Sequence, residues 1–236
     1  MTGSRPAGQQ KLLESLQATG KPVVLVLTAG SALAVDWAKA HLPAILAAWY
    51  PGQRGGNAVA DVLFGTANPA GRLPVTFYKE SEQLPAFDDY SMRGRTYRYF
   101  QGEPLFPFGH GLSYTRFEYS GLKIDRSNAA PGDTVRVSFA VKNVGARAGE
   151  EVAQLYVRAM APRESRALKD LRGLQRFALK PGETREVSFT LVPSRDFAHY
   201  DVEQKRYAVD AGDYEIQLGA SSTDIRLKST VAVHEQ

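Results

Sequence analysis

Hydrolytic chemistry with a nucleophile or a metal would need serine, histidine or cysteine side chains at spacings that bring them together. Ser31 follows an apolar run, but its neighbours do not form the G-x-S-x-G turn of a serine hydrolase, so we expect it to cap a helix. The histidines have no metal-ligand spacing, and cysteine is absent. These histidines are His41, His110, His199 and His234. No catalytic serine, metal or thiolate centre is predicted.

Two pairs of adjacent carboxylates, Asp88–Asp89 and Glu150–Glu151, are the next candidates for acid–base work. Neighbours on an extended chain point in opposite directions, so neither pair forms a catalytic dyad by itself. We expect the aspartates to pair with nearby arginines and the glutamates to form a solvated edge before a strand. The arginines are Arg93, Arg95 and Arg98.

Residues 49–57 (WYPGQRGGN) link an apolar run to an amphipathic helix and could border a ligand. A helix N-terminus attracts anions, but the segment matches neither G-x-G-x-x-G nor the P-loop, and tight turns explain its glycines equally well. Trp49, Tyr50 and Arg54 could contact a polar ligand at the carboxyl end of the preceding strand, where open α/β sheets bind. We take these three as the candidate substrate-binding residues and predict no cofactor.

Composition limits the classes of partner. Of 236 residues, 43% are hydrophobic and 23% are charged, as in globular proteins with a sizeable core. The formal net charge of +4 comes from interspersed residues without a basic run, so no nucleic-acid partner is expected. No segment approaches the roughly 20 apolar residues of a membrane span.

Hydrophobic periodicity predicts an α/β region over residues 1–88. Residues 22–27 and 44–49 are continuously apolar, as in strands buried on both faces, and the crossover between them predicts a parallel βαβ unit. Leu73, Val75 and Phe77 alternate as a third strand. Further helices are expected over residues 9–16, after Ser31, and from the glycine pair or Asn57 onward, with Val59, Val62 and Leu63 toward the sheet.

Three strands are fewer than a stable α/β domain usually contains. We therefore interpret this region as the C-terminal part of a larger α/β sandwich domain and expect the chain to be truncated. Residues 89–115, rich in aromatic and basic side chains, predict an ordered connector. Its aromatics could stack on sugars, but packing between domains is the simpler expectation. Residues 116–236 alternate apolar and polar positions between turn signals, which predicts an all-β, fibronectin type III-like (immunoglobulin-like) sandwich.

Several motifs, in order, resemble the C-terminal part of glycoside hydrolase family 3 with its fibronectin type III-like domain. They are residues 21–27 (KPVVLVL), 44–53 (AILAAWYPGQ), 71–77 (GRLPVTF), 107–114 (PFGHGLSY), 149–157 (GEEVAQLYV) and 171–174 (LRGL). The resemblance covers essentially the whole chain from Gln9. Residues 97–100 (YRYF) are most similar to the branch with bacterial β-xylosidases and related β-glucosidases.

The resemblance implies a part of a retaining exo-β-glycosidase that acts on β-linked glucosides or xylosides. Retaining hydrolysis needs two carboxylates, about 5–5.5 Å apart. In similar enzymes the nucleophile is an Asp of a preceding barrel, and the acid/base is a Glu upstream of the helix that corresponds to residues 9–16. Residues 1–8 contain neither Asp nor Glu. No catalytic residue is therefore assigned, and we expect the chain to be inactive alone.

A non-catalytic alternative remains open from the sequence. The chain could be an accessory module that binds a separate barrel-domain partner or a polysaccharide. Residues 1–6 are followed by no apolar signal-peptide core, so no export signal is expected in the chain as written. The compartment is left unassigned, and a periplasmic or secreted complete enzyme is compatible with the sequence.

Overall fold

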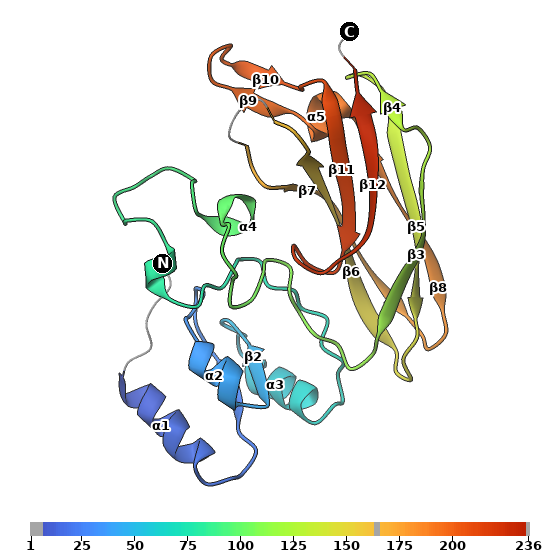
Figure 1. Ribbon diagram of the computed structural model, residues 1–236. Coiled ribbons are helices and arrows are strands. Elements are labelled where there is room, and N and C mark those ends of the chain that lie inside the picture. The colour runs from blue at the N-terminus through green and yellow to red at the C-terminus, as the bar shows by residue number, and fades with distance from the viewer. Residues whose placement is uncertain (1–6, 163–165, 235–236) are drawn as a thin grey trace. The chain divides into compact units, whose positions relative to one another are not determined.

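The computed structural model describes residues 7–162 and 166–234, which divide into two compact units (Figure 1). The α/β unit comprises the chain up to Ala67, Pro74–Thr96 and Phe100–Phe108. The sandwich unit comprises Asn68–Leu73, Tyr97–Tyr99 and the chain from Gly109 onward. The chain thus passes between the units several times rather than once.

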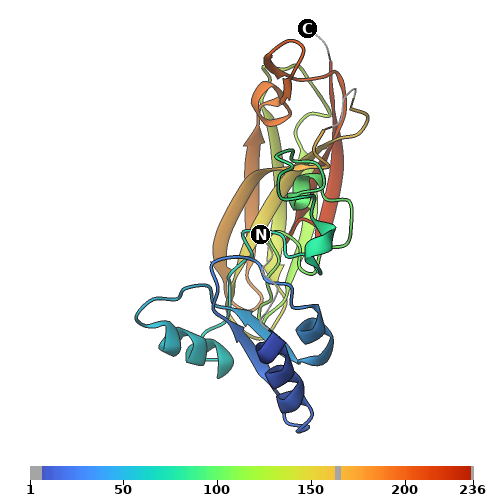
Figure 2. The same ribbon diagram turned by 90° about the vertical axis from the view of Figure 1, so that its left-hand side faces the viewer.

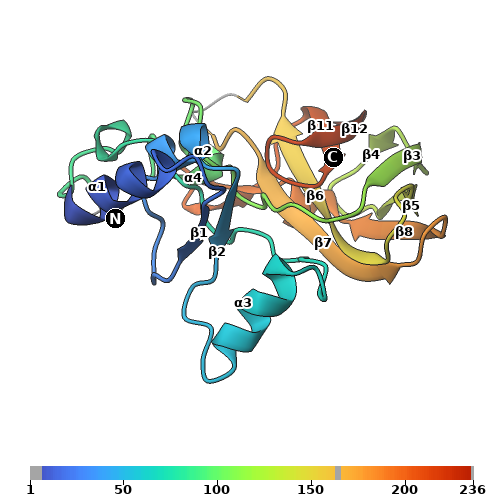
Figure 3. The ribbon, with the colours of Figure 1, turned by 90° about the horizontal axis from the view of Figure 1, so that it is seen from below.

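The α/β unit is built on two parallel strands, β1 (Val24–Leu27) and β2 (Ala44–Ala47). Val24 is paired with Ala44, which confirms the predicted parallel βαβ unit. Figure 3 shows α3 on one side of this strand pair and α1 and α2 on the other. The helices of this unit are α1 (Ala7–Gln17), α2 (Asp36–His41), α3 (Gly55–Leu63) and the 3-10 helix η1 (Ser81–Gln83), whereas the short α4 (Thr96–Tyr99) has all but its first residue in the sandwich unit.

The third strand predicted over Leu73–Phe77 is wrong. Phe77 forms only an isolated antiparallel bridge with Phe106, whereas Leu73 belongs to the sandwich unit and exchanges main-chain hydrogen bonds with Gly109 and His110. Pro74 lies between them and has no N–H to donate, so a continuous ladder is interrupted there. The alternation in sequence reflects two different environments rather than one strand.

The predicted cap of the second helix is also wrong. α2 begins at Asp36 with Val35 as its N-cap, and no side chain closes the cap. Ser31 lies exposed in the loop that follows β1. The negative charge of Asp36 in the first turn is the feature that favours the helix start, because it complements the helix dipole.

Several large apolar side chains of the α/β unit remain exposed. Leu12 of α1 is 59% exposed, Val24 of β1 41%, Leu63 of α3 43%, and the adjoining Phe64 87%. Of the residues predicted to face the sheet from α3, Val59 and Val62 are half-buried and Leu63 is exposed. Two short strands do not cover the apolar faces of the helices around them. Among the described residues, no helix is long and apolar enough to span a membrane.

The sandwich unit contains a five-stranded sheet of order β4-β12-β11-β6-β7 and a three-stranded sheet of order β3-β5-β8. Their bounds are β3 Phe117–Ile124, β4 Asn128–Ala129, β5 Val135–Asn143, β6 Gly149–Ala159, β7 Asp170–Leu179, β8 Thr184–Leu191, β11 Gly212–Gly219 and β12 Ile225–Val233. Burial alternates along β5, because successive side chains point to opposite faces of a strand. The inward residues of both sheets form one core, which includes Phe139, Leu155, Val187, Ile216 and Val231. This confirms the predicted all-β sandwich.

One end of the sandwich carries a separate hairpin. It pairs β9 (His199–Asp201) with β10 (Arg206–Ala208) and follows the single-turn helix α5 (Pro193–Asp196). Figure 2 shows it at the same end of the sandwich as the C-terminal end of β12. The hairpin pairs with neither of the two main sheets.

Candidate functional site

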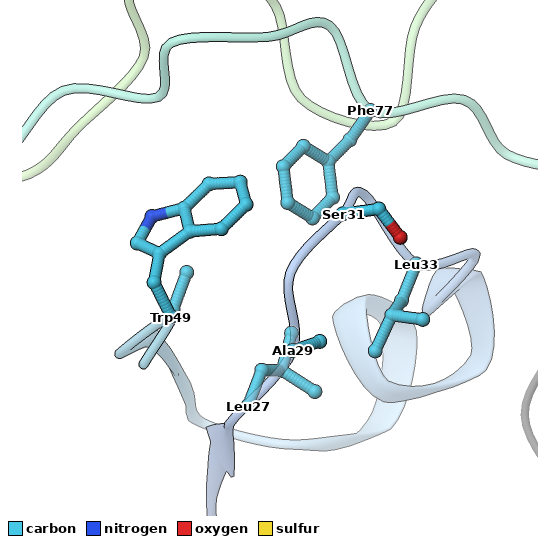
Figure 4. A pocket seen from close by; sticks show the side chains of 7 residues that line it. Leu27, Ala29, Ser31, Leu33, Trp49 and Phe77 are labelled. Atoms are coloured by element: carbon cyan, nitrogen blue, oxygen red, sulfur yellow. The ribbon is translucent and has the colours of Figure 1, made fainter. Parts of the chain in front are cut away.

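The carboxyl ends of β1 and β2 meet at a small hollow in the α/β unit (Figure 4). It is lined by Leu27, Ala29, Ser31 and Leu33 from β1 and its following loop, Ala47 and Trp49 from β2 and its end, and Phe77. The hollow has room for about one water molecule, so it is a surface depression rather than an enclosed cavity. Its position is the edge at which open α/β sheets place their ligands.

Trp49 is the most unusual residue of this hollow. Its backbone has a φ of 53°, the left-handed region that a bulky residue rarely adopts. The indole packs edge-to-face against Phe77, with the ring centroids 6.2 Å apart. In Figure 4 the indole nitrogen points away from Phe77. A strained backbone at the end of a strand is typical of functional sites, because ordinary packing would relax it.

Tyr50 follows at the rim, where it is 75% exposed. Its ring packs on the backbone of Gly30 in the loop after β1, and a Cβ on Gly30 would lie 2.9 Å from Tyr50 Cε2. Glycine permits this close approach, because a side chain at position 30 would require the exposed Tyr50 ring to move. The loops after the two strands therefore fit together through this contact.

Arg54 is not among the residues that line the hollow. It is exposed at the N-cap of α3, where its carbonyl accepts the Ala58 N–H at 3.1 Å. Gly52 has a φ of 73°, and a Cβ on Gly55 would lie 2.5 Å from Pro51 Cγ. Two of the glycines are thus explained by turn geometry, as the sequence allowed.

Phe77 and its neighbours were missed by sequence reasoning. The Phe77 ring packs edge-to-face with Phe106, and the Lys39 ammonium lies 5.0 Å from the centre of the Phe106 ring. Lys39 also donates to the Leu105 carbonyl at 2.7 Å. Phe77 was assigned to a strand by its alternation, and no local signal placed it beside Trp49, which lies far earlier in the chain.

The pair Glu150–Glu151 is not the solvated edge that the sequence predicted. Glu151 is only 2% exposed and accepts a hydrogen bond from Arg72 at 2.7 Å and another from the Val152 N–H at 2.7 Å. Glu150 points to the other face and pairs with Arg176. The two carboxylates therefore diverge, as neighbours on a strand must.

The other buried carboxylates of the described chain are Asp196 and Asp201. Asp196 accepts the Val192 N–H at 2.7 Å, and Asp201 accepts the Gln204 N–H at 2.8 Å. Each closes a local turn and is held by that bond. Together with Glu151, they stabilise the sandwich unit rather than form an acid–base pair.

The predicted charge pairing of the aspartates with arginines holds in part, because a main-chain hydrogen bond has the largest effect on the pKa of Asp89 and the charges of Arg95 and Arg93 add to it. Asp89 accepts the Ser91 N–H at 2.8 Å, and this hydrogen bond lowers the pKa of Asp89. Arg95 donates to main-chain carbonyls, those of Ala86, Asp89 and Ser91. Arg98 pairs with Asp170 of β7 at 2.6 Å, within the sandwich unit.

The histidines lie apart and have different partners. His41 stacks on Trp37 with ring centroids 4.6 Å apart, and His234 lies 3.1 Å from the Asn128 side-chain oxygen. His199 Nδ1 is 4.0 Å from Asp210. Within residues 7–162 and 166–234 no cluster of three or more metal-ligating side chains occurs.

Several of the sequence motifs interlock inside the sandwich unit. Asn68 accepts hydrogen bonds from Ser113 and from the Tyr114 N–H at 3.0 and 2.8 Å, and donates to the Ala148 carbonyl at 2.9 Å. Gln154, which is 3% exposed, donates to the carbonyls of Gly109 and Ala220. These residues hold four segments together, those around Asn68, residues 109–114, residues 148–154 and Ala220, so much of the motif pattern encodes structure rather than catalysis.

Comparison with family models identifies two regions. Residues 2–114 match the glycosyl hydrolase family 3 C-terminal domain, and residues 151–222 match a fibronectin type III-like domain. The second match falls within the sandwich unit.

Relatives match almost the whole chain. A xylan 1,4-beta-xylosidase of Xylanibacter ruminicola is 45% identical over 223 residues, which are 94% of this chain and 25% of the relative. Thermostable beta-glucosidase B of Acetivibrio thermocellus is 38% identical and is matched over 98% of this chain and 32% of its own length. The chain thus spans about a quarter to a third of the length of these relatives.

Solved structures give the same relationship. A beta-glucosidase of Erythrobacter marinus has a TM-score of 0.86 at 39% identity, covering 98% of this chain and 30% of its own. Beta-glucosidase 3B of Thermotoga neapolitana, solved with alpha-D-glucose, has a TM-score of 0.85 at 34% identity, covering 97% and 34%. Both units of the fold therefore occur in these larger proteins.

Proposed function

Because this chain belongs to glycoside hydrolase family 3, as its C-terminal domain followed by a fibronectin type III-like domain, we propose that it serves as the C-terminal portion of a retaining exo-β-glycosidase. The proposed reaction is hydrolysis of terminal β-linked glucosyl or xylosyl groups. The match of almost the whole chain to a β-xylosidase and to β-glucosidases carries the proposal.

The chain by itself is proposed to be inactive. Retaining hydrolysis needs a nucleophilic carboxylate and an acid/base carboxylate about 5–5.5 Å apart. The carboxylates buried in the described residues are Glu151, Asp196 and Asp201, and each is occupied by an arginine or a main-chain N–H. A separate barrel portion would have to supply the catalytic pair.

The test is an assay of the purified chain on aryl β-glucosides and aryl β-xylosides. We expect no release of the aryl group above the buffer rate. Hydrolysis that co-purifies with the chain through successive columns, and is lost with it on immunodepletion, would refute the inactivity.

Within this portion, we propose that Trp49 and Tyr50 form part of a sugar-binding wall, with Arg54 as a peripheral contact. The observation that supports it is the strained Trp49 backbone at the carboxyl end of β2, beside Phe77. An indole offers a flat apolar face to the C–H face of a sugar ring and an N–H to its hydroxyls.

Two substitutions test this wall in an active enzyme in which this chain is joined to the portion that supplies the catalytic pair. Trp49→Gly removes the indole and relieves the left-handed backbone, so the strain relief of about 1–2 kcal/mol should offset part of the packing lost against Phe77, while KM for the aryl glycoside rises about tenfold. Trp49→Phe keeps an aromatic ring and the strain, and should raise KM less. An unchanged KM in the Trp49→Gly variant would exclude the contact.

A second candidate role, a non-catalytic module that docks on a separate barrel protein, is favoured by the exposed apolar side chains of the α/β unit. Leu12, Val24 and Phe64 are 59%, 41% and 87% exposed. Burying them on another protein part would gain about 25 cal/mol per Å² of apolar surface. Size-exclusion chromatography of the chain, mixed with the part of the Xylanibacter ruminicola relative that lies outside the matched region, tests this role. Co-elution supports docking, and separate elution at micromolar concentration contradicts it.

A further inference from the structure

Two exposed tyrosines lie next to each other on the β9–β10 hairpin of the sandwich unit. Tyr200 and Tyr207 are direct cross-strand partners, and their ring centroids are 5.5 Å apart with the ring planes at 76°. Tyr200 is 50% exposed and Tyr207 75%. They contribute nothing to the sandwich core, whose cluster contains neither.

The turn of the hairpin and its buried aspartate direct the two tyrosines toward solvent. Asp201, next to Tyr200, is buried and accepts the Gln204 N–H at 2.8 Å, which closes the turn. Lys205 takes a left-handed conformation with a φ of 52° to complete that turn. Because successive residues of a strand point to opposite faces, anchoring Asp201 inward holds Tyr200 outward.

The tyrosine pair has the properties of a sugar-stacking surface. Rings that meet at 76° form two walls of a corner, so a sugar can lay its C–H face on one ring and its edge against the other. Each phenol group also offers a donor and an acceptor to hydroxyl groups. Arg206 precedes Tyr207 in β10 and is paired with Asp201 across the hairpin, so it lies on the face opposite the two tyrosines, where it is hydrogen-bonded to the Gln204 side chain at 2.8 Å.

The charges of the hairpin favour a neutral ligand. Asp201 and Glu203 are balanced by Lys205 and Arg206, so the hairpin has neither the basic excess that nucleic acids require nor an acidic excess for a cationic partner. We infer that Tyr200 and Tyr207 form a binding surface for a neutral β-linked polysaccharide, a glucan or xylan chain. The flat rings of β-linked glucose and xylose present the C–H faces that such a surface takes up. The choice of glucose and xylose as the sugars rests on the proposed function, whereas the location of the binding surface on the hairpin does not.

A depletion assay tests the surface. The full chain is mixed with insoluble xylan or cellulose, and the unbound fraction is measured against the amount of polysaccharide. We expect the wild type to be retained, Tyr207→Ala to bind about threefold more weakly, and Tyr200→Ala/Tyr207→Ala about tenfold more weakly, given the usual strength of aromatic contacts. Retention should change little with salt, because a neutral ligand offers no charge to screen.

Matched variants distinguish this surface from binding elsewhere on the chain. Tyr90→Ala removes a tyrosine that is 92% exposed in the α/β unit and should leave retention unchanged. Tyr200→Phe/Tyr207→Phe keeps both rings and should retain most of the binding, which guards against a loss caused by misfolding of the hairpin.

Three results would each overturn the inference. The first is no retention of the wild type on either polysaccharide. The second is a loss of retention in Trp49→Ala but not in Tyr200→Ala/Tyr207→Ala, which would place binding at the hollow of the α/β unit. The third is retention that disappears at high salt, which would show adhesion through charge.

Discussion

Gly109 lies against the side chain of Gln154 so closely that a Cβ atom on Gly109 would be 2.2 Å from Gln154 Oε1. Gly109 also has a φ of 81°, a conformation that favours glycine. Gln154 cannot retreat freely, because it is 3% exposed, donates to two main-chain carbonyls and accepts the Tyr156 hydroxyl. One residue of the segment 107–114 thus fits one residue of β6.

This contact predicts a large cost for Gly109→Ala. We expect the free energy of unfolding to fall by about 3 kcal/mol or more, since backbone strain adds to a clash with a buried hydrogen-bonded group. Gly121→Ala is the matched control, because Gly121 has a φ of 65° with no atom near its missing Cβ, and it should cost only about 1 kcal/mol. Urea denaturation followed by circular dichroism measures both. Equal losses would show that close approach to Gln154 is unimportant.

The buried ion pair of Arg72 and Glu151 should behave differently from an exposed one. Arg72→Met leaves the Glu151 carboxylate buried without its partner and should cost about 3–5 kcal/mol. Arg72→Met/Glu151→Leu should recover most of that loss, since Arg72 Nε is buried without a hydrogen-bond partner and the pair is imperfectly satisfied.

The exposed ion pair between Arg176 and Glu150 is the control for this comparison of single and double variants. Removing it should lower the free energy of unfolding by less than about 1 kcal/mol. Denaturant unfolding of the single and double variants gives the coupling energies. A double variant at Arg72 and Glu151 that is as unstable as Arg72→Met would contradict the expected recovery.

Two adjacent glycines at the start of α3 should respond in opposite directions to alanine. Gly55→Ala places a Cβ 2.5 Å from the Pro51 ring and should destabilise the α/β unit by about 1–3 kcal/mol. Gly56→Ala meets no atom within 4 Å and should stabilise it by about 0.5–1 kcal/mol, through higher helix propensity. Thermal unfolding measures both. Similar effects of the two substitutions would mean that the turn does not depend on the Pro51–Gly55 contact.

Lys169 predicts a stability change with pH. Burial lowers the pKa of Lys169 to about 8 in the folded state, below its ordinary value of 10.5. Between these values the unfolded chain binds more protons, so stability should rise as pH increases from about 8 toward 10. Because the side chain is partly exposed, the gain should be of the order of 1 kcal/mol rather than the full value of the shift.

Lys169→Met should abolish this rise relative to wild type, whereas Lys180→Met, at an exposed position, should retain it. Measurements should stop near pH 9.5, because burial raises the pKa values of Tyr119 and Tyr156, and tyrosine ionisation in the unfolded chain opposes the trend from about pH 10. A difference between wild type and Lys169→Met that stays constant with pH would refute the assignment.

The sequence predicts the parts of the fold that local patterns encode. The apolar runs at β1 and β2 and the alternation along β5, β8, β11 and β12 correspond to observed strands. The alternation at Leu73–Phe77 misleads, because Leu73 bonds to Gly109 and His110 while Phe77 bonds to Phe106. Tertiary contacts decide which segment a short apolar stretch pairs with. The alternation of apolar and polar residues carries no information about those contacts.

The candidate site was predicted only in part. Trp49 and Tyr50 could be chosen because they follow an apolar run and precede a turn, and the structure places both at the carboxyl end of β2. Phe77 comes from a distant segment, and the left-handed backbone of Trp49 has no signature in its own residue type. Glu151 was misassigned because its partner, Arg72, lies far away in the sequence.

The central claim is that this chain is the C-terminal portion of a β-glycosidase whose catalytic carboxylates lie outside it. The most direct measurement is turnover of aryl β-xyloside and aryl β-glucoside by a chimera in which this chain replaces the matched region of the Xylanibacter ruminicola relative, beside the chain alone. We predict turnover by the chimera and none by the chain. A folded chimera without activity, or a chain that hydrolyses either substrate alone, would contradict the claim.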